Sequence, residues 1–392
     1  MSLRACRNVV LALTLSLSTG LMALVSEAQG QAARYESSAK QAILMDSGSG
    51  KVLFEKEADE LMHPASMSKI MTMIMVFERL ESGRLSLDDE FSVSENAWRR
   101  GGATSGGSTM YLELNSRVSL DNLIKGVIVQ SGNDACIVIA EGIAGSEQAF
   151  ADMMTDRARQ LGLEKSTFQN ATGLTHPEHQ MTPRELALLA RYLIEVFPEY
   201  YKTYSIPEFT WNNITQPNRN PLLNSYPGAD GIKTGYVQAA GYGLTGSAKR
   251  DGRRLIMVIN GLDSIRARAD EARKMLDWGF RQYRTVELYQ AGDSVGRARV
   301  WGGSERWVNL AAKDDVRLAL SDEERDATTV EVAYNGPLMA PVDNGAEVGT
   351  VRFKVDGRVI SESPLVTARA VDAAAPIWSR AIDSVAYMIF GG

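Results

Sequence analysis

The chain has 392 residues, a formal net charge of −6, two cysteines and three histidines. A chain of this length is longer than a single hydrophobic core usually accommodates, so we expect two domains. The negative charge and the absence of basic clusters argue against a nucleic-acid partner. His176 and His179 lie in a predicted loop with few further cysteines or histidines to complete a metal site, so we expect no zinc and no other cofactor.

The N-terminal segment predicts an export signal. Arg4 and Arg7 precede an apolar stretch from Val9 to Val25, and Ser26-Glu27-Ala28 supplies a small-x-small cleavage site. We therefore expect residues 1–28 to be removed after export. The alternative, a retained transmembrane anchor, is less favoured because serine, threonine and glycine residues interrupt the apolar stretch.

The first domain, predicted over residues 34–283, has an α+β pattern. Two short strand-like segments around a glycine-rich turn predict a hairpin at residues 42–54. Helical apolar segments follow between residues 66 and 145 and again at residues 184–196. Further predicted elements are two strands and a closing helix, at residues 241–248, 254–260 and 267–280. Strands, then helices, then strands predict one antiparallel sheet with a helical cluster against it.

Ser66 is the candidate nucleophile. It stands three residues before Lys69, at the start of an apolar run from Ile70 to Phe77 that predicts a buried helix. A lysine at the edge of an apolar core is disfavoured in its charged form and can act as a base for a neighbouring hydroxyl. An isolated S-x-x-K is more often a helix-capping serine followed by a solvated lysine. The second match, Ser37 to Lys40, leads into a strand-like segment and is the weaker candidate.

Ser131-Gly132-Asn133 forms a polar break between two apolar segments, residues 120–129 and 135–143. Such a break can direct side chains into a cleft, although on its own it is usually a helix connection. The other S-x-N match, Ser94 to Asn96, is interpreted as a surface turn or helix cap. Cys136, in the second apolar segment, is interpreted as a buried structural thiol.

Lys233-Thr234-Gly235 precedes the strand predicted at residues 242–248. Lys233 and Thr234 are suited to receive a carboxylate, and Gly235 would let a substrate backbone approach closely. On its own this tripeptide is more often an ordinary turn.

The C-terminal part differs in character. Short strand-like pieces alternate with Gly, Asp and Asn turns over residues 285–371, which predicts a small β-rich domain acting as a spacer or interaction module. Residues 376–390 follow an alanine-rich linker and place apolar residues, including Trp378, on one helical side. The segment is too short to span a bilayer and predicts a helix lying on the membrane surface. The alternative is a helix that packs back on the protein.

The order, spacing and flanks of the three motifs resemble the low-molecular-mass penicillin-binding proteins, the serine-type D-alanyl-D-alanine carboxypeptidases. The resemblance covers nearly the whole mature chain. It implies Ser66 as acyl-enzyme nucleophile, Lys69 as its base and Ser131 as proton relay. The implied substrate contacts are Asn133, Lys233, Thr234 and Arg219, of which Arg219 matches the family least closely. The implied oxyanion donors are the backbone N–H groups of Ser66 and Tyr236.

The same resemblance implies removal of the terminal D-alanine from peptidoglycan pentapeptides, covalent inhibition by β-lactams, and a location on the periplasmic face of the cytoplasmic membrane. The alternatives are a β-lactamase, an esterase or a D,D-endopeptidase of the same fold, or a non-catalytic binder of peptidoglycan peptides. Gly132 stands where class A β-lactamases have Asp, and Pro177-Glu178-His179 does not resemble their deacylating loop. We therefore expect slow release of bound penicillin.

Overall fold

The computed structural model describes residues 35–374. The predicted export signal and the predicted surface helix at residues 376–390 lie outside the described residues, so both remain predictions. Within residues 35–374, no helix has the length and apolar character needed to cross a membrane.

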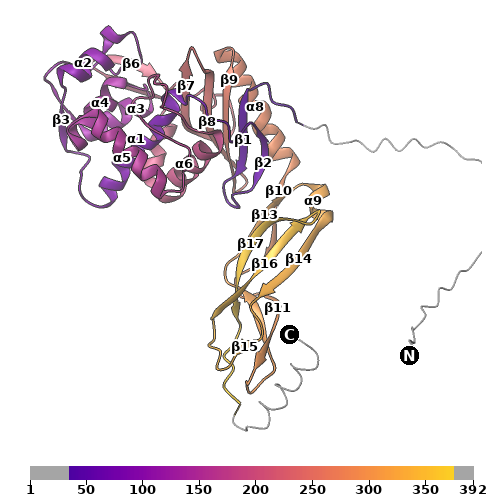
Figure 1. The fold of residues 1–392 in the computed structure, drawn as a ribbon. Coiled ribbons are helices and arrows are strands. Elements are labelled where there is room, and N and C mark those ends of the chain that lie inside the picture. Colours follow the sequence, from indigo (N-terminus) through magenta and orange to yellow (C-terminus); the bar gives the residue numbers. More distant parts are fainter. Residues whose placement is uncertain (1–34, 375–392) are drawn as a thin grey trace, which may run out of the picture. The chain divides into compact units, whose positions relative to one another are not determined.

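A five-stranded antiparallel sheet lies at the centre of the first domain, with strand order β2-β1-β9-β8-β7 (Figure 1). Its strands are β1 (Gln41–Asp46), β2 (Val52–Lys56), β7 (Ala229–Val237), β8 (Gly241–Arg250) and β9 (Arg253–Leu262). The predicted hairpin is confirmed, with Leu44 paired to Phe54. Because β1 pairs with β9, the first and last strands of the domain lie side by side in the sheet.

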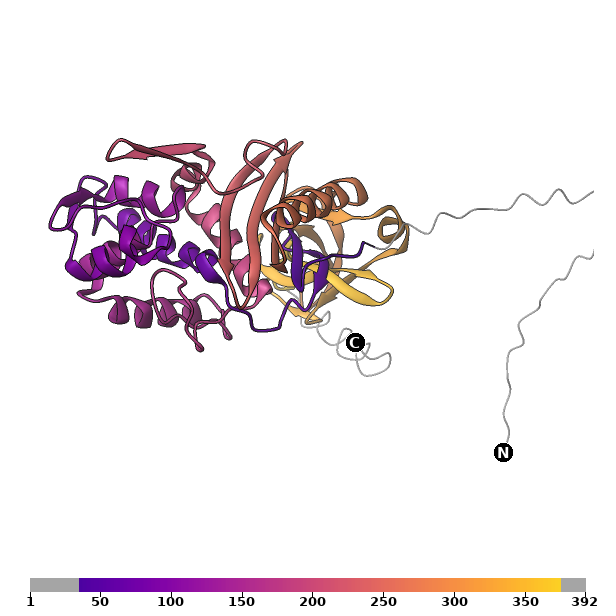
Figure 2. The same ribbon diagram turned by 90° about the horizontal axis from the view of Figure 1, so that it is seen from above.

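Helices cover both faces of this sheet (Figure 2). The helices of the domain are α1 (Lys69–Glu81), α2 (Glu95–Gly101), α3 (Leu120–Ile128), α4 (Asn133–Ala144), α5 (Glu147–Gln160), α6 (Pro183–Val196), α7 (Pro198–Tyr201) and α8 (Ile265–Gln282). Side chains of β1 and β9 alternate between the two faces. Ile43 and Val258 join the core of the helical cluster, whereas Leu44 and Met257 pack with α8 residues such as Met275. The predicted α+β fold is therefore confirmed.

Three local features differ from the sequence expectations. Ser66 lies in a 3₁₀ turn, η1 (Ala65–Ser68), that precedes α1, so it is not in the α-helix itself. Lys233-Thr234-Gly235 lies inside strand β7, whereas the sequence placed it before a strand. Two small two-stranded sheets were not predicted: β3 (Glu90–Ser92) with β4 (Arg117–Ser119), and β5 (Glu208–Trp211) with β6 (Ile214–Pro217).

The C-terminal domain is β-rich, as predicted, and has its own core around residues such as Val308, Leu310 and Phe353. Its six-stranded sheet has the order β14-β16-β17-β12-β11-β15, and β10 pairs with β13 beside it. The elements are β10 (Arg284–Tyr289), β11 (Ser294–Trp301), β12 (Trp307–Ala312), β13 (Val316–Leu320), α9 (Asp322–Ala327), β14 (Thr328–Tyr334), β15 (Leu338–Met339), β16 (Glu347–Val355) and β17 (Arg358–Thr367).

Candidate active site

Ser66 stands on a turn with a constrained backbone. The preceding residue, Ala65, has a φ of +49°, a conformation that costs free energy for a residue with a side chain. Met67, on the same turn, is fully buried and anchors it in the helical core. The turn therefore holds the Ser66 hydroxyl at the edge of the core, where the side chain lines a cavity.

Lys69 is the first residue of α1 and is only 1% exposed. Its Nζ atom lies 2.9 Å from Ser66 Oγ, 2.8 Å from Asn133 Oδ1 and 2.5 Å from the carbonyl oxygen of Thr172. Two of these three partners, the amide and carbonyl oxygens, can only accept hydrogen bonds. A neutral amine that donates to both of them directs its lone pair at the third partner, the Ser66 hydroxyl.

Burial lowers the pKa of Lys69 to about 8, and the nearby Arg219 charge acts in the same direction. Within residues 35–374, no carboxylate lies within ion-pairing distance of Lys69 to stabilise its charged form. The structure thus favours a lysine that changes protonation state near neutral pH.

Ser131 and Asn133 lie at the junction of α3 and α4, as the sequence predicted. Ser131 has a φ of +60° and is 2% exposed, and its Oγ atom has no hydrogen-bond partner among the residues that the structure describes. An unpartnered buried hydroxyl in a strained backbone conformation is typical of a functional position. Asn133 accepts from Lys69 through Oδ1, so its Nδ2 group is free to face the cavity.

Lys233 and Thr234 lie on β7, beside η1, the turn that carries the candidate nucleophile Ser66 and that we call the nucleophile turn. Lys233 is 3% exposed, and in the described part of the chain its Nζ atom makes one long hydrogen bond, 3.4 Å, to the carbonyl oxygen of Thr234. Burial lowers its pKa well below the ordinary value, and the positive charges of Lys69 and Arg219 lower it further. An anion bound in the cavity would reverse this electrostatic effect.

Gly235 is required by packing. A Cβ atom at this position would lie 2.8 Å from the carbonyl oxygen of Pro64 and 3.2 Å from the Cβ atom of Ala65. Strand β7 therefore approaches the nucleophile turn so closely that only glycine fits. The sequence interpretation, close approach of a substrate backbone, did not include this contact.

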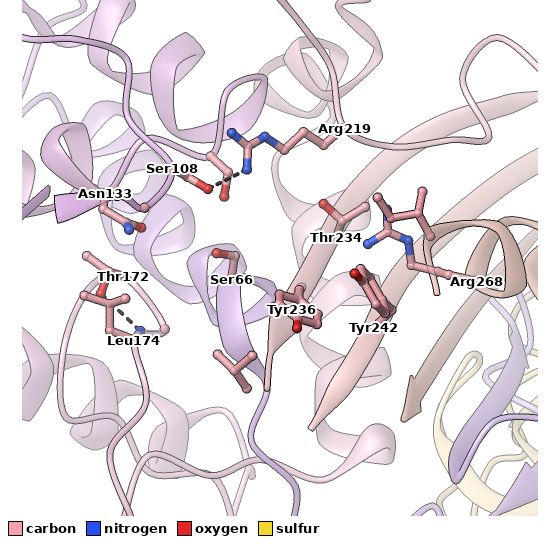
Figure 3. Close-up of a pocket in the computed structure, with 17 residues that line it drawn as sticks. Ser66, Ser108, Asn133, Thr172, Leu174, Arg219, Thr234, Tyr236, Tyr242 and Arg268 are labelled. Carbon is pink, nitrogen blue, oxygen red and sulfur yellow. Dashed lines mark hydrogen bonds between the residues drawn. The ribbon is translucent and has the colours of Figure 1, made fainter. Parts of the chain in front are cut away.

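The site opens into a cavity of about 730 Å³ (Figure 3). Its lining includes Ser66, Ser131, Asn133, Arg219, Thr234 and Tyr236. Arg219 reaches across the cavity and donates a hydrogen bond to Ser108 Oγ. Lys69 and Lys233 lie beneath this lining as buried residues. The structure thus brings together every side chain that the sequence singled out for the site.

Arg268 is a cavity residue that the sequence interpretation missed. It extends from α8 toward Thr234 and Tyr242 (Figure 3), and it is 6% exposed. Its Nε atom has no hydrogen-bond partner within residues 35–374, and its guanidinium lies 5.8 Å from the Tyr242 ring centroid. Helical periodicity could have identified it, because Arg268 falls on the same buried face of α8 as Ala272, Met275 and Leu276. A charged residue on the buried face of a helix marks a position with a specific partner.

Asp134 was also missed. Its buried carboxylate accepts hydrogen bonds from Thr109 Oγ1 at 2.6 Å and from the backbone N–H groups of Met110, Leu112 and Ala135 at 3.0–3.1 Å. These contacts fix the segment that begins at Ser108, whose carbonyl oxygen accepts from Asn133 N at 2.8 Å. Asp134 therefore links the start of α4 to one wall of the cavity.

His179 is buried, and its pKa is lowered to about 3, chiefly by loss of solvation. Its Nδ1 atom accepts from the backbone of Gln169. In the part of the chain that the structure describes, no three His, Cys, Asp or Glu side chains are arranged to hold a metal ion. Cys136 is a buried free thiol, as predicted.

An α+β domain in which a buried lysine contacts a serine hydroxyl is typical of one class of serine-type peptidases. Residues 27–264 match the family described as D-alanyl-D-alanine carboxypeptidase, and residues 283–373 match the penicillin-binding protein 5 C-terminal domain. The chain therefore belongs to the D-alanyl-D-alanine carboxypeptidase family.

Relatives of similar length support this membership. The D-alanyl-D-alanine carboxypeptidase DacC of Escherichia coli is 41% identical over 333 residues, which are 84% of this chain and 83% of that protein. DacF of Bacillus subtilis is 36% identical over 83% of this chain and 84% of its own length. Crystal structures of penicillin binding protein 5 from Haemophilus influenzae match with a TM-score of 0.78 and 34% identity, covering 86% of this chain and 98% of that one.

Proposed function

We propose that this protein is a serine-type D-alanyl-D-alanine carboxypeptidase that removes the terminal D-alanine from peptidoglycan pentapeptides. The observation that supports this most directly is the 2.9 Å contact between Lys69 Nζ and Ser66 Oγ at a buried lysine with a lowered pKa. The domain limits we propose are residues 34–283 for catalysis and residues 285–371 for the β-rich domain.

In the proposed acylation step, neutral Lys69 removes the proton from Ser66 Oγ, and the oxygen attacks the carbonyl carbon of the penultimate D-alanine. The backbone N–H groups of Ser66 and Tyr236 stabilise the oxyanion. Ser131 then relays the proton that Lys69 accepted to the leaving nitrogen, the C–N bond breaks and D-alanine departs. Water cleaves the acyl-enzyme ester and restores the Ser66 hydroxyl.

The terminal carboxylate of the peptide binds at the cationic end of the cavity. Lys233, Thr234 and Arg268 converge there, and Arg219 adds positive charge from the opposite wall. Asn133 Nδ2 donates to a substrate carbonyl. A free carboxylate on the leaving residue favours carboxypeptidase activity over internal cleavage, because an internal peptide bond has no such group to offer.

The β-lactamase alternative receives less support. Glu178 is exposed and is not part of the cavity lining, and no Asp or Glu lines the cavity within the described residues. The site therefore offers no carboxylate to activate water against a penicilloyl ester, and β-lactams should act as slowly released covalent inhibitors. Two assays decide between the functions: release of D-alanine from a pentapeptide and hydrolysis of penicillin. Rapid penicillin turnover without release of D-alanine would contradict the proposal.

The proposed location is the outer face of the cytoplasmic membrane, reached through export and held by residues 376–390. The apolar stripe in that sequence supports the proposal. Truncation after Ala375 should yield active enzyme that no longer sediments with membranes. Equal recovery of the full-length protein in the soluble fraction would contradict it.

A further inference from the structure

The β-rich domain has an outward-facing sheet surface that the peptidase site does not use. It lies on β11, the start of β12 and β15, at the end of the domain away from β10 and α9 (Figure 1). We call it the arginine–tryptophan face, and it consists of Arg297, Arg299, Trp301, Trp307 and Met339.

Strand register places these five side chains on one side of the sheet. Arg299 pairs with Trp307, and Trp301 pairs with Met339. The intervening residues Ala298, Val300 and Val308 are at most 1% exposed and point into the domain core. Because side chains alternate along a strand, the arginine–tryptophan face points away from that core.

The face is open and cationic. Met339 is 61% exposed and Trp307 is 44% exposed. The Arg297 guanidinium stacks on the Trp307 ring at 4.8 Å. Neither Arg297 nor Arg299 has a carboxylate partner among residues 35–374, and the neighbouring Glu305 is paired with Arg369. Exposed tryptophan and methionine beside arginine are suited to a lipid headgroup region, where the rings are partly desolvated and the guanidinium groups meet phosphate.

The course of the chain brings this face close to the proposed membrane segment. The backbone N–H of Ala374 donates to the carbonyl oxygen of Gly302, the residue after Trp301, at 2.8 Å. Pro376 follows two residues later, a distance of at most about 7 Å along the chain. A tail that lies on the bilayer from residue 376 therefore holds this end of the sheet within reach of the headgroups.

We propose that the arginine–tryptophan face docks on anionic phospholipid headgroups and forms a second membrane contact beside the tail. This inference rests on the membrane contact proposed for residues 376–390. The arginine–tryptophan face makes membrane binding depend on anionic lipid, a dependence that the apolar stripe of the tail alone would not produce.

Vesicle sedimentation of the full-length protein tests the proposal. The face variant is Arg297→Gln/Arg299→Gln/Trp307→Ser, and the tail variant is Ile382→Asp/Val385→Asp. The matched control is Arg358→Gln/Val359→Ser on β17, where Val359 is 47% exposed. Vesicles are either phosphatidylcholine alone or phosphatidylcholine and phosphatidylglycerol in equal parts.

On the mixed vesicles, the face variant should partition roughly 10- to 30-fold more weakly than the parent, because two cations near an anionic surface are lost. On phosphatidylcholine alone the difference should be small, and the control should match the parent on both. Arg297→Gln alone should give a smaller loss in the same direction. Unchanged D-alanine release shows that each variant is folded.

Parent-like binding of the face variant to mixed vesicles would overturn the inference, as would an equal loss in the control. The tail variant separates the two proposals. If it binds as the parent does, the tail proposal fails, whereas a loss confined to the tail variant contradicts only the arginine–tryptophan face.

Discussion

Lys69 Nζ lies 2.9 Å from Ser66 Oγ, and the same nitrogen contacts two obligate acceptors, Asn133 Oδ1 and the Thr172 carbonyl oxygen. These two neutral oxygens orient the base here, whereas in a serine–histidine pair a carboxylate holds the imidazole. Burial supplies the lowered pKa, and the two oxygens fix the direction of the lone pair.

The first prediction concerns the pH dependence of acylation. In the proposed mechanism Lys69 acts as the neutral amine, and its pKa is lowered to about 8. The neutral fraction rises as pH increases through that value, so kcat/KM should increase from pH ~6 and level off above pH ~9. Stopped-flow acylation by a chromogenic β-lactam measures this profile. A flat profile over this range would contradict the assignment.

A second prediction separates charge from basicity at the same position. Lys69→Arg keeps a cation, but guanidinium does not deprotonate in this pH range. Acylation should fall roughly 10²- to 10⁴-fold, the usual contribution of a positioned base. The matched control is Lys125→Arg on α3, a partly exposed lysine paired with Asp121. Near-parental acylation by Lys69→Arg would remove Lys69 from the role of base.

A third prediction concerns the terminal carboxylate. Lys233→Glu or Arg268→Gln should cost roughly 2–5 kcal/mol in kcat/KM on a D-alanyl-D-alanine peptide, if the charge contact is desolvated. The loss should be much smaller on the matching peptide amide, which lacks that carboxylate. Arg266→Gln is the control, because its side chain is 93% exposed on the same helix. Equal losses on the acid and the amide would show that these residues do not recognise the carboxylate.

The motifs predicted the members of the site because sequence spacing along one helix or one strand limits where side chains can lie. Lys69 follows Ser66 by three residues, and Ser131 and Asn133 flank a single glycine. The same local patterns predicted the hairpin at β1 and β2 and the closing helix α8. They could not place Lys233 inside a strand, because its neighbours Gly231, Thr234 and Gly235 are residue types that are equally common in turns.

Arg268 and Asp134 could not be assigned from local patterns because their partners are distant in the sequence. Arg268 reaches Thr234 and Tyr242 only after α8 has packed on the sheet (Figure 3). Asp134 accepts from residues 22–25 positions earlier, across the whole of α3. The role of Gly235 depends in the same way on contact between β7 and the nucleophile turn.

A fourth prediction follows from the contacts of Asp134. Asp134→Asn removes the charge that four N–H or O–H groups share and replaces one acceptor with a donor. We expect the free energy of unfolding to fall by about 2–4 kcal/mol and KM to rise as the segment from Ser108 loosens. Urea denaturation and steady-state kinetics measure the two effects. Asp152→Asn, on the exposed side of α5, is the control and should change neither.

The central claim is that Ser66 forms the acyl-enzyme. The most direct measurement is incubation with a labelled penicillin followed by peptide mass mapping, carried out on the parent and on Ser66→Ala. We expect one penicilloyl group on the peptide containing Ser66 and no label in the variant. A label on Ser131 or Ser37, or undiminished labelling of Ser66→Ala, would contradict it.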